Sequence, residues 1–113
     1  MAFTEKKLVT GTSQINTSET TVYTVPASTT GIVKIIWITN VTSADVQISM
    51  WNPTTGSTTS DANQLLDTVT IPSYDFVQIN TYLPIAATGT IVAKMITGAA
   101  SSATVNLYGA EIT

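Results

Sequence analysis

Short runs in which apolar and polar residues alternate dominate the chain. Within residues 45–51, every second residue from Val46 to Met50 is apolar, and residues 75–83 and 104–107 alternate in a similar way. A period of two places successive side chains on opposite faces of a β-strand. We therefore expect strands with one buried face and one face toward water, as antiparallel sheets commonly have.

Eight strands are expected, several of them with this alternation, separated by clusters of Gly, Pro, Asn, Ser and Asp about every ten residues. No stretch keeps apolar residues at the spacing of an amphipathic helix. The pattern predicts an all-β chain, folded as an antiparallel, jelly-roll-like β-sandwich without substantial helix. The expected strands cover residues 7–15 (irregular around Gly11), 20–25, 32–41, 45–51, 64–71, 75–83, 90–96 and 103–112.

The third expected strand, residues 32–41, is apolar on both of its faces. Strict alternation puts three apolar residues on the side opposite its isoleucines at 32, 36 and 38: Val33, Ile35 and Trp37. Two apolar faces indicate that both are covered. The outer cover is either another part of the chain, such as the N-terminal segment, or a neighbouring subunit.

The start of the chain is polar and weakly patterned. We interpret residues 1–10 as an N-terminal arm, followed by a single sandwich domain of residues 11–113. Such an arm is usually disordered in a free domain. In an assembly, Phe3 would anchor in a pocket of a neighbour, and Lys6 and Lys7 would face an acidic rim.

The composition argues against catalysis and against nucleic-acid binding. The chain has no cysteine, histidine or arginine, and only 10% of its residues are charged. This excludes zinc sites of the usual kinds, histidine acid–base catalysis and bidentate arginine contacts to phosphate. The carboxylates show no catalytic pairing, and residues 61–63 lack the acidic cluster of a dedicated calcium site. We predict a protein that is not an enzyme and uses no cofactor or metal.

Hydroxyl groups take the place of the missing charges. The chain contains 23 Thr and 10 Ser, and its net charge of −3 repels neighbouring copies only weakly. Such a surface tolerates close packing beside copies of itself.

The chain carries no membrane or targeting signal that we can identify in its sequence. The longest apolar run, residues 35–38, is too short to span a bilayer, and the first residues lack the pattern of a signal peptide. We expect synthesis in a cytoplasm and no membrane partner.

Two aromatic residues are expected to be the most exposed. Trp51 ends the fourth expected strand, and Tyr74 lies in the turn before the sixth. Both rings would either cap the open ends of the sandwich or stack on sugars of a glycan.

Much of the chain resembles a type of small bacteriophage virion protein. The similarity is carried by residues 21–34 (TVYTVPASTTGIVK), a strand and turn that lead into a long apolar strand ending at Asn40. It continues in the alternating residues 46–50 (VQISM) and in residues 105–111 (VNLYGAE). The resemblance covers about residues 20–112 and includes no catalytic residues.

This resemblance implies an all-β sandwich module of the virion. Proteins of this type are found as capsid decoration (cement) proteins and as tail or fibre components, commonly in trimers or higher rings. We accordingly expect a structural protein that coats the assembled phage head through its apolar sheet face and its arm. Its partners would be the major capsid protein or another virion protein, and copies of itself, with a trimer favoured. The alternative is a tail or fibre module that recognises glycans on the host surface.

Overall fold

The computed structural model describes residues 2–54 and 57–113. Met1, at the start of the expected arm, and residues 55–56 lie outside the described part. Within that part the chain forms nine strands and one short 3-10 turn at Asp61–Asn63. The strands are, in chain order, β1 (Phe3–Lys7), β2 (Gln14–Ile15), β3 (Thr20–Thr24), β4 (Thr30–Asn40), β5 (Val46–Trp51), β6 (Gln64–Ile71), β7 (Phe76–Ile85), β8 (Thr90–Thr97) and β9 (Ala103–Ile112).

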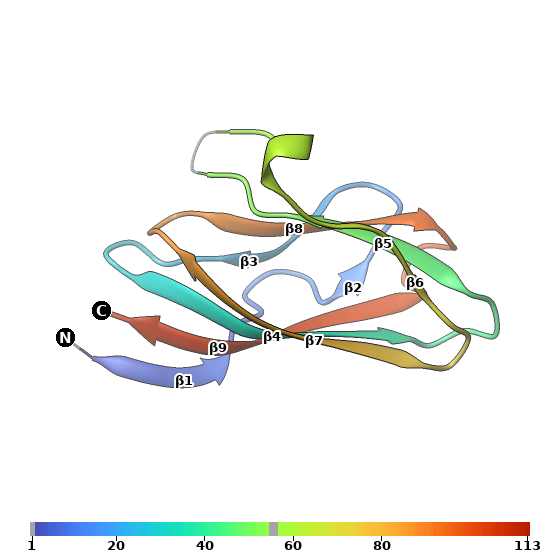
Figure 1. The fold of residues 1–113 in the computed structure, drawn as a ribbon, viewed down its shortest axis with the longest axis horizontal. Helices are drawn as coiled ribbons and strands as arrows, with labels where there is room; N and C mark the ends of the chain where they lie inside the picture. The colour runs from blue at the N-terminus through green and yellow to red at the C-terminus, as the bar shows by residue number, and fades with distance from the viewer. Residues whose placement is uncertain (1, 55–56) are drawn as a thin grey trace.

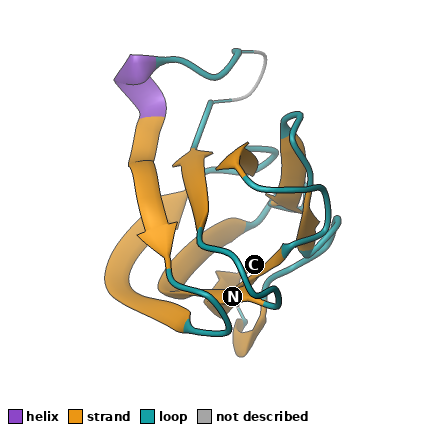
Figure 2. Cartoon of the chain, turned by 90° about the vertical axis from the view of Figure 1, so that its right-hand side faces the viewer, coloured by secondary structure: helices purple, strands orange, loops and turns teal. Residues whose placement is uncertain are grey.

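The strands form two sheets that pack face to face (Figure 1). One sheet has the order β1-β9-β4-β7, with β2 also paired to β9, and the other has the order β3-β8-β5-β6. All the strand pairs are antiparallel. In the view turned by 90°, the 3-10 turn stands off from the two sheets (Figure 2).

The strand pairing identifies the topology. The pairs β2–β9, β3–β8, β4–β7 and β5–β6 describe one long hairpin whose tip is the connection from β5 to β6. The pairs β4–β9 and β5–β8 then roll this hairpin into two layers. This is the strand order of a jelly roll. The structure therefore confirms the expected all-β, antiparallel, jelly-roll-like sandwich.

The hydrophobic core fills the space between the two sheets. Both sheets and the segment that follows β1 contribute to it, and the burial of this apolar surface is the main stabilising term. The largest fully buried side chains include Leu8, Ile15, Tyr23, Ile38, Ile48, Met50, Ile71, Ile91, Met95 and Leu107.

The expected strand at residues 7–15 is wrong, because β1 and β2 occupy only its two ends. Between them the chain runs against β3, where the amide of Gly11 donates to the carbonyl of Val22 at 3.0 Å. A Cβ atom on Gly11 would lie 2.2 Å from the carbonyl oxygen of Thr21. This close approach requires glycine, and it interrupts the strand.

Residues 2–10 are not a disordered arm. All five residues of β1 pair with β9 as an edge strand, although each of them remains exposed. Leu8 is fully buried in the core, and its amide donates to the carbonyl of Leu107 at 2.8 Å. Pairing with β9 and the burial of Leu8 in the core therefore hold this segment in place. A boundary at residue 10 would separate Leu8 from the core to which it belongs.

A β-bulge at Lys34 changes which side of β4 faces the core. Val33 pairs with Gly109 and Ile35 pairs with Tyr108, so two positions on β4 are matched by one step on β9. Val33 consequently points inward and is fully buried, whereas Ile35 lies half-buried on the outer side. The expected interface role of Val33 is therefore wrong, because an assumption of strict alternation leaves out the extra residue that the bulge adds.

The two ends of the described chain lie side by side (Figure 1). The amide of Ala2 donates to the carbonyl of Thr113 at 3.0 Å, and the amide of Thr113 donates to the carbonyl of Ala2 at 2.9 Å. These two hydrogen bonds extend the β1–β9 ladder beyond the last residues of both strands.

Candidate functional site

The outer side of the β1-β9-β4-β7 sheet gathers most of the aromatic residues of the chain, and we call it the aromatic face. The register pairs Ile35 with Tyr108 and Thr39 with Phe76, which places these side chains on the same side as Trp37. Five of the eight aromatic residues lie on this face: Phe3, Trp37, Phe76, Tyr82 and Tyr108. Four of the five are exposed by 38–68% of their surface, so the face is open to a partner.

A stacked pair of rings lies at the end of the aromatic face where β7 begins. The rings of Trp37 and Phe76 lie 4.6 Å apart between centroids, and their planes are inclined by only 7°. The indole nitrogen of Trp37 donates to the hydroxyl of Thr39 at 3.2 Å. These contacts hold Trp37 in one orientation, which lowers the conformational entropy lost on binding.

A hollow of about 350 Å³ lies beside Trp37, and we call it the tryptophan slot. It is lined by Ile35, Trp37, Thr39, Asn106 and Tyr108. Because Phe76 stacks on Trp37 from β7, the slot lies over the β9 side of the indole. Among the described residues, the buried Oδ1 oxygen of Asn106 has no hydrogen-bond partner. A buried acceptor without a donor is unusual in a folded protein.

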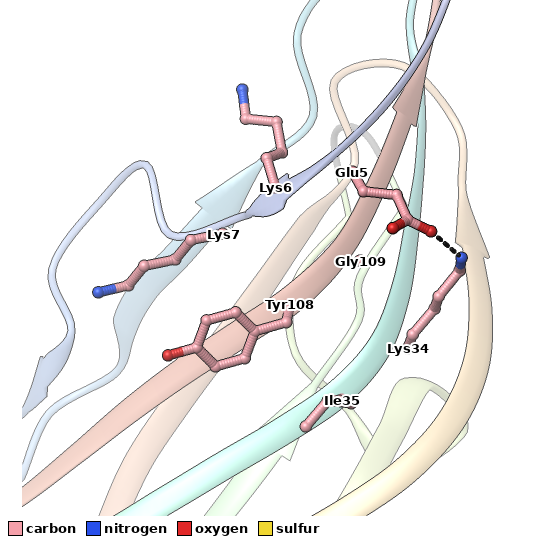
Figure 3. Close-up of a pocket in the computed structure, with 7 residues that line it drawn as sticks. All are labelled: Glu5, Lys6, Lys7, Lys34, Ile35, Tyr108 and Gly109. Carbon is pink, nitrogen blue, oxygen red and sulfur yellow. Dashed lines mark hydrogen bonds and ion pairs between the residues drawn. The ribbon is translucent and has the colours of Figure 1, made fainter.

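A second hollow of about 420 Å³ lies between β1, β9 and β4, and we call it the lysine hollow (Figure 3). The Lys34 ammonium pairs with Glu5 Oε1 at 3.1 Å and lies 5.3 Å from the centroid of the Phe3 ring. The side chains of Lys7 and Tyr108 extend in the same direction (Figure 3), as expected for directly opposed residues of neighbouring strands. Three of the four lysines of the chain line this hollow: Lys6, Lys7 and Lys34.

Three residues from β1, β3 and β9 form a hydrogen-bonded group between the sheets. The hydroxyl of Tyr23 donates to Glu111 Oε2 at 2.7 Å, and the Lys6 ammonium donates to Oε1 at 3.0 Å. Hydrogen bonding from Tyr23, with help from Lys6, lowers the pKa of Glu111 against the opposing effect of burial. Burial, reinforced by Glu111, raises the pKa of Tyr23. Both shifts favour a charged carboxylate held by a neutral phenol.

This group predicts a stability that falls at both ends of the pH scale. As the pH drops below 4.5, the ordinary pKa of Glu111, the unfolded chain binds a proton before the folded one does. As the pH rises above 10.0, the ordinary pKa of Tyr23, the unfolded chain loses a proton first. The free energy of unfolding, measured by urea titration across the pH range, should therefore decline in both regions. A Glu111→Gln variant should show a smaller acid decline, and an unchanged decline would contradict the assignment to Glu111.

The two hollows offer contacts for binding. Apart from the apolar and aromatic residues, their linings carry hydroxyl, amide and ammonium groups, and a carboxylate of Glu5 that is already paired with Lys34. Within residues 2–54 and 57–113, no three metal-ligating side chains come together. In the same part of the chain, no helix has the length and apolar character needed to cross a membrane.

The structure brings together most, but not all, of the predicted interface residues. Phe3 and Lys7 lie on the same aromatic face as Ile35 and Trp37, Lys7 near Ile35 and Phe3 toward the other end of the sheet, whereas Lys6 is turned toward Glu111. The residues that the sequence analysis missed lie on β7 and β9: Phe76, Tyr82, Asn106 and Tyr108. Their alternation was visible in the sequence, but the pairing of β7 and β9 with β4 was not.

The two predicted glycan-stacking residues lie far apart. Trp51 is half-buried and pairs with Gln64, at the start of β6. Tyr74 is 72% exposed and lies beyond Ile71, at the opposite end of β6. The two rings therefore cannot form a single stacking platform.

The chain was compared with known protein families, with curated proteins and with solved structures, and none of the three comparisons found a match.

Proposed function

We propose that this chain is a non-enzymatic structural protein of a bacteriophage virion, a decoration (cement) protein that attaches to the assembled head. The observation that carries the proposal is the aromatic face. Its exposed rings gather on one side of a sandwich whose surface is otherwise rich in hydroxyl groups and poor in charge. Exposed apolar patches and aromatic residues are typical of protein–protein interfaces.

The arrangement of the face suits attachment to a preformed surface. The stacked Trp37 and Phe76 are held in place before binding, and β1 adds Phe3 and Lys7 at the edge. The major capsid protein, or another virion protein, is the proposed partner. A homo-oligomer, with a trimer favoured, and a location on the capsid surface after synthesis in the host cytoplasm belong to the same proposal.

Replacement of Trp37 should abolish most of the attachment. We expect Trp37→Ala to weaken binding to capsids assembled without this protein by at least about 30-fold, the typical effect of losing an aromatic anchor. Co-sedimentation over a range of protein concentrations measures the affinity, and thermal unfolding verifies that the variant folds. Trp51→Ala is the matched control, since Trp51 lies outside the aromatic face.

Two results would contradict this proposal. One is a wild-type protein that does not bind capsids, and the other is a folded Trp37→Ala variant that binds as tightly as the wild type. Cryo-electron microscopy of purified virions measures the number of copies of this protein on each particle and their position. Many copies over the shell support decoration, whereas a few copies at one vertex would assign the protein to the tail.

A tail or fibre module for host glycans is the alternative, with Trp51 and Tyr74 as the stacking residues. The separation of these two rings weakens it, because each would have to bind a sugar alone. A glycan-array signal that is lost in Tyr74→Ala and kept in Trp37→Ala would favour this alternative over decoration.

A further inference from the structure

The lysine hollow and the tryptophan slot adjoin each other, and we call the two together the groove. Ile35 and Tyr108 line both of them, so the hollows meet where β4 and β9 pair. The groove runs along these strands from Lys7 and Lys34 at one end to Asn106 at the other. A ligand that fills it must therefore be elongated and must match two different environments.

One end of the groove carries an uncompensated positive charge. Lys6 is paired with Glu111 and Lys34 with Glu5, whereas Lys7 has no hydrogen-bond or ion-pair partner among the described residues. The whole chain has a net charge of −3, so this positive end is a local feature. Lys7 lies directly opposite Tyr108, and the two side chains point the same way (Figure 3). An ammonium and a hydroxyl so placed can both donate to one carboxylate.

The other end of the groove has apolar walls and one hydrogen-bond acceptor that lacks a donor in the described part of the chain. The Trp37 ring and Ile35 form apolar walls of the slot, which suits an aliphatic side chain. The Oδ1 oxygen of Asn106 is buried and lacks a donor among the described residues, so it can accept a hydrogen bond from a ligand only after the amide rotates about χ2. A backbone N–H of a bound segment would supply that donor.

The strand register fixes the distance between the two ends. Lys7 is opposite Tyr108, and Trp37 is opposite Asn106, two residues away on β9. Two residues of extended chain span about 7 Å, and side chains at positions i and i+2 point to the same side. An extended peptide therefore matches the groove when an acidic residue and an apolar residue are separated by one residue.

From these features we infer that the groove binds an extended protein segment with the pattern acidic–any–apolar. The acidic side chain lies between Lys7 and Tyr108, the apolar one enters the tryptophan slot, and a backbone amide bonds to Asn106. This inference rests on the proposed function, because it names the kind of segment that a virion partner would present. A neutral saccharide would leave Lys7 without a counter-charge, so the observations favour the peptide.

A synthetic peptide tests this inference by NMR titration of the full chain. The probe is a capped heptapeptide with Asp at its third position, Leu at its fifth, and Ser or Thr elsewhere. We expect shifts at the Trp37 indole, the Asn106 side-chain amide and the amides of Lys7 and Tyr108. Replacing Asp by Asn in the peptide should weaken its affinity about threefold or more, the size of effect expected for an exposed ion pair. A peptide with Asp and Leu adjacent should bind more weakly than the probe.

Two protein variants separate the role of Lys7 from a general loss of charge. In Lys7→Gln, the Asp and Asn peptides should bind equally well, and in Lys94→Gln the preference for Asp should persist. Lys94 is a suitable control because it lies on β8 of the other sheet and lines neither hollow. An Asp preference that survives in Lys7→Gln would overturn the inference.

Other outcomes would also overturn it. These are shifts caused by a neutral tetrasaccharide but not by the peptide, and the same shifts caused by raising the protein concentration alone, which would assign the groove to a second copy. The inference and the proposed function fail separately. Capsid binding without peptide binding removes only the peptide motif, whereas peptide binding without capsid binding keeps the groove and removes the decoration role.

Discussion

Gly109→Ala should destabilise the protein by about 3–5 kcal/mol, the range of severe single substitutions. A Cβ atom at this position would lie 1.9 Å from the carbonyl oxygen of Ile32 and 3.1 Å from the amide nitrogen of Lys34. Both neighbours are backbone atoms of the bulge in β4, so no side chain can move aside. The pairing of β9 with β4 holds the first sheet together, and it would have to open locally to admit one methyl group.

Urea unfolding monitored by tryptophan fluorescence measures this effect. Since folded domains are stable by only about 5–15 kcal/mol, the variant should unfold at a much lower urea concentration or fail to accumulate. Thr104→Ala, on the outer side of the same strand, is the control and should change the stability by less than about 0.5 kcal/mol. A Gly109→Ala variant as stable as this control would show that the bulge tolerates a side chain and that the described approach of β4 and β9 is wrong.

Tyr23→Phe should cost about 2 kcal/mol, within the range for hydrogen bonds to charged groups. The substitution keeps the buried ring and removes only the hydroxyl that donates to Glu111 Oε2 at 2.7 Å. The carboxylate then keeps Lys6 as its one side-chain donor, and the pKa of Glu111 should rise toward its ordinary value. The loss of stability above pH 10.0 that we assign to Tyr23 should disappear as well.

A double-mutant cycle isolates this contact. If the effect arises from the hydrogen bond, Tyr23→Phe and Glu111→Gln together should cost less than the sum of the single changes, by at least about 0.5 kcal/mol. Lys6→Met is a useful comparison, because the Lys6 ammonium is more exposed than the phenol and should contribute less. Additive costs for Tyr23 and Glu111 would contradict the role given to their hydrogen bond.

The strands from residue 20 onward follow from the sequence because their pattern has a period of two and their ends carry Gly, Pro or Asp. Their observed limits agree with the expected ones to within two residues. The segment before residue 20 could not be predicted in this way. Its course depends on Gly11 packing against the backbone of β3 and on Leu8 entering a core formed by distant strands. These are tertiary contacts, and local alternation contains no signal for them.

The candidate site was predictable only in part for a related reason. The alternation of residues 32–41 predicts Ile35 and Trp37 on the face opposite the isoleucines at 36 and 38, and the structure places both on the outer side. Val33 was misplaced because a bulge adds a residue without changing the local composition. The partners of Trp37 come from strands about 40 and 70 residues further along the chain, where register decides which side chains meet.

The hydrogen bonding of Ala2 to Thr113 has a practical consequence for engineering. Because Ala2 and Thr113 hydrogen-bond to each other, any peptide fused to either end would leave the sandwich from the same corner. A short linker between the two ends would close the backbone into a ring without disturbing either sheet. New termini could then be opened in a surface turn, giving circular permutants whose affinity tags emerge from another part of the molecule.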